Sequence, residues 1–107
     1  MALKSWSTIH IFGYGETQII GKSDDDSPLS KKKKTTDLTT VEAVVDDIFT
    51  HKPDGNSAVK DQYHAINIFN NSDVRFMPKG KDVKGFSVKV SELDAQKLNA
   101  LISEISA

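Results

Sequence analysis

Cysteine is absent from the 107 residues, which excludes several kinds of chemistry at once. Disulfide frameworks, thiol nucleophiles and zinc sites with thiolate ligands all require it. A chain of this length buries a core without such staples, so we expect one domain over residues 1–107 that folds without a metal or cofactor. A cysteine-free chain also fits a reducing compartment, and we therefore expect the cytoplasm.

Long apolar runs and an excess of one charge are also lacking. The first twelve residues, MALKSWSTIHIF, contain no apolar stretch of signal-peptide length, so we expect neither export nor membrane contact. Fourteen basic residues against fifteen acidic ones leave the chain nearly neutral. No field of the whole molecule would attract nucleic acid, so any such contact has to be local.

Alternation of apolar and polar residues predicts strands, most clearly over 7–12 and 63–69. Glycines follow the first of these strands and indicate a tight turn. A three-residue loop at 13–15 would place Ile9 opposite Ile19 and keep the aliphatic side chains on one face of a hairpin. By the same argument Ile11 lies opposite Thr17.

Two segments show the spacing of amphipathic helices, one within 38–51 and one within 91–105. Pro53 follows and ends the first, and Ser91 with Asp94 resembles an N-terminal cap of the second. The apolar stripes are Val41, Val44, Val45, Ile48 and Phe49 in the first helix, and Leu98, Leu101, Ile102 and Ile105 in the second.

Residues 22–37, KSDDDSPLSKKKKTTD, have almost nothing to bury and are predicted to form an exposed loop. A further hairpin is expected from 73–78 and 85–90, with Phe86, Val88 and Val90 facing inward. The predicted fold is α+β, an antiparallel sheet of four to five strands with both amphipathic helices on one face. The order of elements would be β-β-α-β-β-β-α.

The stretch TIHIFGYGE, residues 8–16, recurs in altered form as AINIFNNSD, residues 65–73. Either a duplicated unit or convergence on strand-forming residues explains the echo. Both strands carry large side chains opposite their isoleucines, on a face that two helices on the other side would leave uncovered. Exposed apolar faces of this kind usually bind a partner. The leading hypothesis is a non-enzymatic assembly protein that associates with itself or another protein through Trp6, His10, Phe12, Tyr63, Asn67 and Phe69.

A small nucleic-acid-binding domain is the alternative. The lysine run 31–34 and the basic hairpin 75–89 would neutralise phosphates, while Phe76 or Phe86 stacks on a base. The predicted contacts in the hairpin are Arg75, Lys79, Lys81 and Lys84.

Catalysis is a further alternative, with His10 and Glu16 as an acid–base pair. The other histidines offer less: His51 falls in the last turn of the first helix, and His64 is expected on the strand face of Ile66. No two of the three have a compact metal-ligand spacing, so no metal site is predicted. The GYG stretch lacks the third glycine and following helix of a dinucleotide fingerprint.

Overall fold

The computed structural model describes residues 3–13, 15–34 and 39–106, which form six strands, two α-helices and a short 3₁₀ turn. In chain order these are β1 (Leu3–Phe12), β2 (Glu16–Ser23), β3 (Pro28–Lys34), α1 (Thr39–Phe49), β4 (Tyr63–Phe69), β5 (Asp73–Pro78), β6 (Phe86–Lys89), the 3₁₀ turn η1 (Val90–Glu92) and α2 (Ala95–Ser106).

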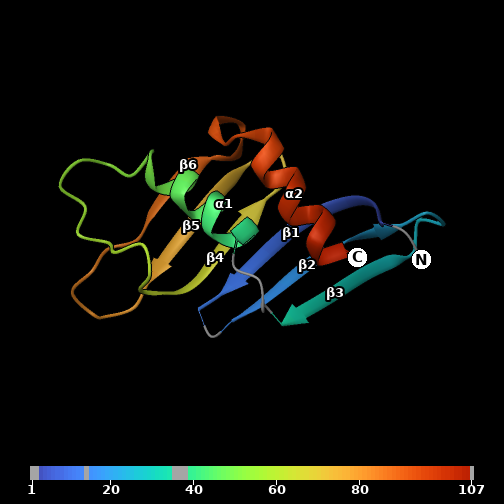
Figure 1. Cartoon of the computed structure of the whole chain (residues 1–107), viewed down its shortest axis with the longest axis horizontal. Coiled ribbons are helices and arrows are strands. Elements are labelled where there is room, and N and C mark those ends of the chain that lie inside the picture. Colours follow the sequence, from blue (N-terminus) through green and yellow to red (C-terminus); the bar gives the residue numbers. More distant parts are fainter. Residues whose placement is uncertain (1–2, 14, 35–38, 107) are drawn as a thin grey trace.

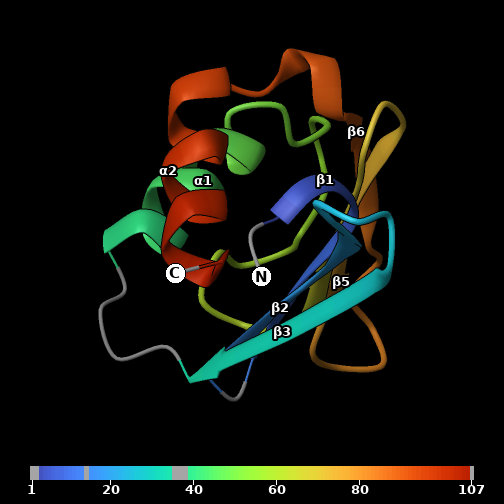
Figure 2. The same cartoon turned by 90° about the vertical axis from the view of Figure 1, so that its right-hand side faces the viewer.

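The strands form one antiparallel sheet in the order β3-β2-β1-β4-β5-β6, with both helices on the same face (Figures 1 and 2). The predicted α+β class and the single helical layer are confirmed. The predicted four to five strands and their order are wrong, because β3 adds a sixth strand before α1.

Strand β3 lies inside the segment that was expected to be a loop. Its residues pair with β2 along its whole length, and Lys22 and Ser23 belong to β2 itself. The loop prediction is therefore wrong over 22–23 and 28–34, while 35–37 lie outside the described residues. Two of its lysines face α2: the Nζ of Lys31 donates to the Ser106 carbonyl (2.8 Å), and the Nζ of Lys33 donates to that of Glu104 (2.9 Å). The positive charges of these lysines interact favourably with the partial negative charge at the C-terminal end of the helix. Lysines on an edge strand also oppose aggregation through its free backbone groups.

The core lies between the sheet and the two helices. Val41, Val44, Val45 and Ile48 are buried in α1 as predicted, and Phe49 packs beside them. In α2 the buried residues are Leu98, Leu101 and Ile105, with Ile102 partly buried.

The predicted cap of α2 by Ser91 is wrong. Ser91 belongs to η1, and the Oδ1 of Asp94 accepts hydrogen bonds from the backbone N–H groups of Gln96 (2.9 Å) and Lys97 (3.3 Å). Asp94 therefore serves as the N-cap.

Both hairpin predictions are confirmed. Ile9 pairs with Ile19 and Ile11 pairs with Thr17 across the three-residue loop. Phe86 and Val88 face the core from β6, and Val90, in η1, packs partly buried against it.

Residues 50–62 form turns between α1 and β4, and the helix ends at Phe49, before Pro53.

The two halves of the chain have the same arrangement, each a three-stranded meander followed by a helix. Adding 57 to a residue number in the first half gives its counterpart in the second: His10 is equivalent to Asn67, and these two pair across the central strands β1 and β4. The N–H of Gly13 donates to the His64 carbonyl (2.8 Å), and its counterpart Asn70 donates to that of Ser7 (2.9 Å). The halves are thus related by a quasi-two-fold axis that passes through the His10–Asn67 pair.

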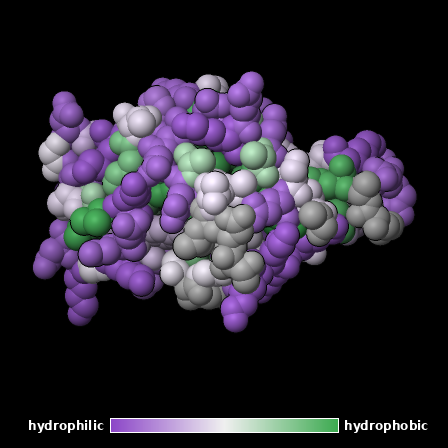
Figure 3. All heavy atoms as spheres, viewed as in Figure 1, coloured by the Kyte–Doolittle hydropathy of each residue, from purple (hydrophilic) through white to green (hydrophobic). Residues whose placement is uncertain are grey.

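Each helix covers strands of the opposite half. Phe49 at the end of α1 packs edge-on against Phe76 of β5 and Phe86 of β6, with ring centroids 4.9 and 5.5 Å apart. Helix α2 lies against β2 and β3. The helix-bearing side of the molecule is mostly hydrophilic on its outside, with scattered apolar patches (Figure 3). The two halves therefore share one core.

Candidate functional site

The sheet face opposite the helices is the candidate site, and we call it the open face. A row of paired residues, one from each of the six strands, crosses the middle of this face. A further row of paired residues lies on each side of this middle row. Among the described residues, no helix or further layer covers it (Figure 2). The middle row consists of Lys32, Gln18, His10, Asn67, Arg75 and Ser87; the flanking rows hold Lys34, Glu16, Phe12, Ala65 and Met77 on one side, and Ser30, Ile20, Thr8, Phe69, Asp73 and Lys89 on the other.

His10 and Asn67 form the centre of the open face. The Nδ1 of His10 lies 2.5 Å from the Oδ1 of Asn67, with both side chains partly buried. An amide oxygen only accepts hydrogen bonds, so Nδ1 of His10 is the donor in this contact. The structure thus brings His10 and Asn67 of the predicted partner surface together on one face of the sheet.

Phe12 and Phe69 are equivalent under the quasi-two-fold axis and lie on opposite sides of the central pair. The Phe12 ring stacks on His10, with centroids 5.7 Å apart and an interplanar angle of 24°. The Arg75 guanidinium lies 5.6 Å from the centroid of Phe69. These contacts orient both rings on the face.

Trp6 and Tyr63 were expected on the same face, and that placement is wrong. The pairing of β1 with β2 shifts register between Trp6 and Thr8, and that of β4 with β5 shifts at the equivalent place, between Tyr63 and Ala65. An extra residue in a strand reverses the side on which the preceding side chain lies. Both aromatic rings therefore pack against the core on the helix side.

The basic residues of the alternative site do not converge. The lysine run and the 75–89 hairpin lie at opposite edges of the sheet, and Lys31 and Lys33 are held by α2. Of the predicted hairpin contacts, Arg75 is on the open face, whereas Lys79, Lys81 and Lys84 are exposed in the connection between β5 and β6. Phe76 and Phe86 are core residues that stack on each other, so neither is available for a base.

The histidines are also dispersed. His10 is bonded to an amide rather than a carboxylate, and Glu16 pairs one row away, opposite Phe12. His64 was predicted to share the strand face of Ile66, and that prediction is wrong. Its side chain is exposed, next to the register shift in β4. Nδ1 of His51, two residues beyond α1, lies 3.7 Å from a Glu92 carboxylate oxygen. Within residues 3–13, 15–34 and 39–106, no cluster of His, Asp and Glu has the composition of a metal site.

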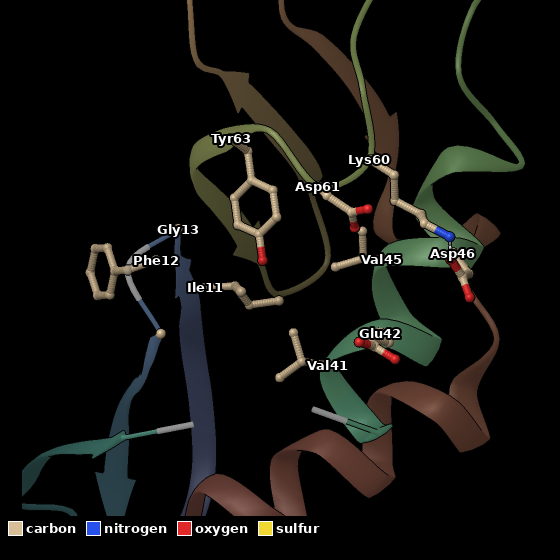
Figure 4. A pocket seen from close by; sticks show the side chains of 11 residues that line it. Ile11, Phe12, Gly13, Val41, Glu42, Val45, Asp46, Lys60, Asp61 and Tyr63 are labelled. Carbon is tan, nitrogen blue, oxygen red and sulfur yellow. Dashed lines mark ion pairs between the residues drawn. The ribbon is translucent and has the colours of Figure 1, made fainter. Parts of the chain in front are cut away.

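Two grooves lie where the register-shifted aromatic residues meet the helices. The first, of about 550 Å³, runs between Tyr63, the β1–β2 turn and α1 (Figure 4). The second, of about 520 Å³, runs between Trp6, the β4–β5 turn and α2. Burial, and to a lesser degree the nearby Asp61, raises the pKa of the Tyr63 phenol above its usual value of 10. The phenol is therefore neutral at physiological pH.

Sequence patterns missed Ile20 and Met77 of the open face, and both grooves. The Ile9–Ile19 register predicts Gln18 opposite His10, and the structure pairs these two residues. The grooves depend on the two register shifts, for which the alternating pattern carries no signal.

Comparison with family models gave no match, and comparisons with curated proteins and with solved structures gave no significant match. In the part of the chain that the structure describes, no helix is long and apolar enough to cross a membrane.

Proposed function

We propose that this protein is a non-enzymatic interaction domain that self-associates through its open face. The observation that carries the proposal is a continuous, uncovered sheet face with Phe12 and Phe69 placed symmetrically about the His10–Asn67 pair. Two such faces would pack about 10 Å apart, as paired sheets do.

The composition of the open face supports an interface. Apolar side chains lie near its centre and charged ones mainly toward the outer strands, which is the anatomy of protein–protein contacts. Met77 is 42% exposed, one of the two large hydrophobic residues most exposed within the described part. A few aromatic anchors of this kind provide most of the binding energy of an interface, while polar partners set its register.

The area of the open face sets the strength of association. Six strands spaced by about 4.8 Å span about 24 Å, and three rows with their side chains span about 20 Å. Two stacked copies would bury roughly 1,000 Å² in total, at the lower limit for a specific interface. We therefore expect a reversible dimer with a dissociation constant on the order of micromolar.

Nucleic acid binding is the second candidate, because four cationic residues of the three rows outnumber two carboxylates. The cations are Lys32, Lys34, Arg75 and Lys89; the carboxylates are Glu16 and Asp73, of which Asp73 pairs with Lys89 at 3.4 Å. The two candidates differ in salt dependence. Added salt screens the repulsion between two like-charged open faces and strengthens the dimer, whereas it weakens binding to phosphates.

Analytical ultracentrifugation at several concentrations and two salt concentrations tests the proposal. The wild type should dimerise more strongly at high salt, and the Phe12→Ser/Phe69→Ser variant should remain monomeric with unchanged circular dichroism. Val59→Ser is the matched control, because Val59 is 48% exposed but lies off the sheet.

Three results would contradict the proposal: a wild type that is monomeric throughout, a folded double variant that associates like the wild type, and equal weakening by the control. Tight, salt-sensitive binding of a generic oligonucleotide by a monomeric wild type would favour the second candidate.

A further inference from the structure

The two grooves are equivalent under the quasi-two-fold axis. Tyr63 in the first corresponds to Trp6 in the second, and Val41 of α1 corresponds to Leu98 of α2. The turn residue Gly13 of the first groove likewise corresponds to Asn70 of the second. Each groove is thus built from the same three features of the fold: an aromatic ring, a hairpin turn and an aliphatic residue of a helix.

The rims of the grooves differ in charge. Around the first groove lie Glu42, Asp46 and Asp61, with Lys60 as the single cation among its described lining residues. The rim of the second groove has amides and hydroxyls, with Lys89 as its charged member: its polar lining residues are Asn70, Asn71, Ser72, Lys89 and Ser91. Because the equivalent groove forms without carboxylates, the acidic rim is not a requirement of the fold.

Of the three carboxylates, Asp46 pairs directly with a described residue, whereas Asp61 and Glu42 act on Lys60 only electrostatically. Lys60 pairs with Asp46, with its Nζ 2.5 Å from Oδ1. Glu42 and Asp61 make no hydrogen bond or ion pair with any described residue. The first groove therefore keeps a net negative charge on its rim, at positions from two different elements.

The floor of the first groove is apolar. Ile11, Val41 and Val45 lie below the Tyr63 ring, whose hydroxyl points into the groove (Figure 4). That hydroxyl makes no hydrogen bond to the described part of the chain. A floor of this kind accepts a hydrocarbon body, the ring adds a surface that attracts cations, and about 550 Å³ is within the usual range of small-molecule sites.

We propose that the first groove binds a small organic amine. Its charged nitrogen lies between Glu42 and Asp61, and its hydrocarbon body lies on Ile11, Val45 and the Tyr63 ring. The charge complementarity of the rim selects a cation, the apolar floor selects one with a hydrophobic body, and the carboxylates involved lie away from the open face. Phe12 lines the groove and also lies on the open face, but the carboxylates that select the amine belong to α1 and to the segment before β4.

Titration of the ¹⁵N-labelled protein with phenethylammonium, followed by NMR, tests the site. The backbone amides of Gly13, Gly15 and Tyr63 should shift and saturate. Phenethyl alcohol, which has the same body without the charge, should bind about ten-fold more weakly, as should the amine to the Glu42→Gln/Asp61→Asn variant. The Asp24→Asn/Asp54→Asn variant removes the same charge from exposed positions elsewhere and should bind like the wild type.

Several outcomes would overturn the proposal. Equal binding of the alcohol, shifts centred on Trp6 and Leu98, or unchanged affinity of a folded Glu42→Gln/Asp61→Asn variant would each do so. A lysine-containing tripeptide is the second probe. If it saturates the same amides at a tenth of the amine concentration, the groove recognises a peptide side chain and the assignment to a small amine is wrong.

Discussion

Phe76 and Phe69 lie on opposite faces of neighbouring strands and offer a matched test of which face is the core. Phe76 is 1% exposed, and its ring contacts Phe49, Phe86 and Tyr63 with centroids 4.9, 5.2 and 5.6 Å apart. Removing such a side chain costs its burial and leaves a cavity, so Phe76→Ala should lower the free energy of unfolding by about 4 kcal/mol. Phe69 lies on the open face, where the loss of its Arg75 contact and partial burial should cost about 1 kcal/mol.

Urea denaturation followed by circular dichroism measures both variants, at a concentration where the protein is monomeric. With a slope of about 2 kcal/mol/M, the midpoint should fall by about 2 M for Phe76→Ala and by about 0.5 M for Phe69→Ala. A domain of this size has a stability of about 5–15 kcal/mol, so even the first variant retains a measurable transition. Equal shifts, or a larger one for Phe69→Ala, would refute the assignment of the two faces.

Three further predictions concern single positions. Gly21→Ala should lower the melting temperature sharply or prevent folding, because a Cβ there would lie 2.0 Å from the Ser5 carbonyl oxygen; a folded variant with wild-type melting would contradict the β1–β2 register. Asp94→Ala should cost about 1 kcal/mol in urea denaturation, while Asp94→Asn keeps the cap and most of that stability; equal losses would argue against capping. The Tyr63 phenol, identified by ultraviolet difference from Tyr63→Phe, should titrate above pH 10, and stability should fall as the pH rises from 10 through its raised pKa; a normal pKa would contradict its burial.

The alternating and helical patterns of the sequence determined most of the local structure. Ile9, Ile11 and Ile19 specify a hairpin register, because slipping by one residue would put isoleucines in water. The stripes of α1 and α2 specify their buried faces for the same reason. His10 and Phe12 could thus be assigned to the face opposite the isoleucines from the sequence alone.

Strand β3 was decided by tertiary contacts. Its lysines have little intrinsic tendency to form a strand, and its pairing depends on the free edge of β2 and on the carbonyl groups at the end of α2. Both of those partners are distant in the sequence or exist only once the sheet has formed. A local pattern therefore predicted a loop.

The positions of Trp6 and Tyr63 were likewise decided by the folded sheet. The register shifts beside Ser7 and His64 arise where each hairpin turn donates a backbone hydrogen bond to the opposite central strand. Such a bond exists only when β1 and β4 are neighbours, and strand order is not encoded in the period of either strand. The same pairing gives the echo of TIHIF and AINIF its structural meaning, because it alone places His10 opposite Asn67 on the quasi-two-fold axis.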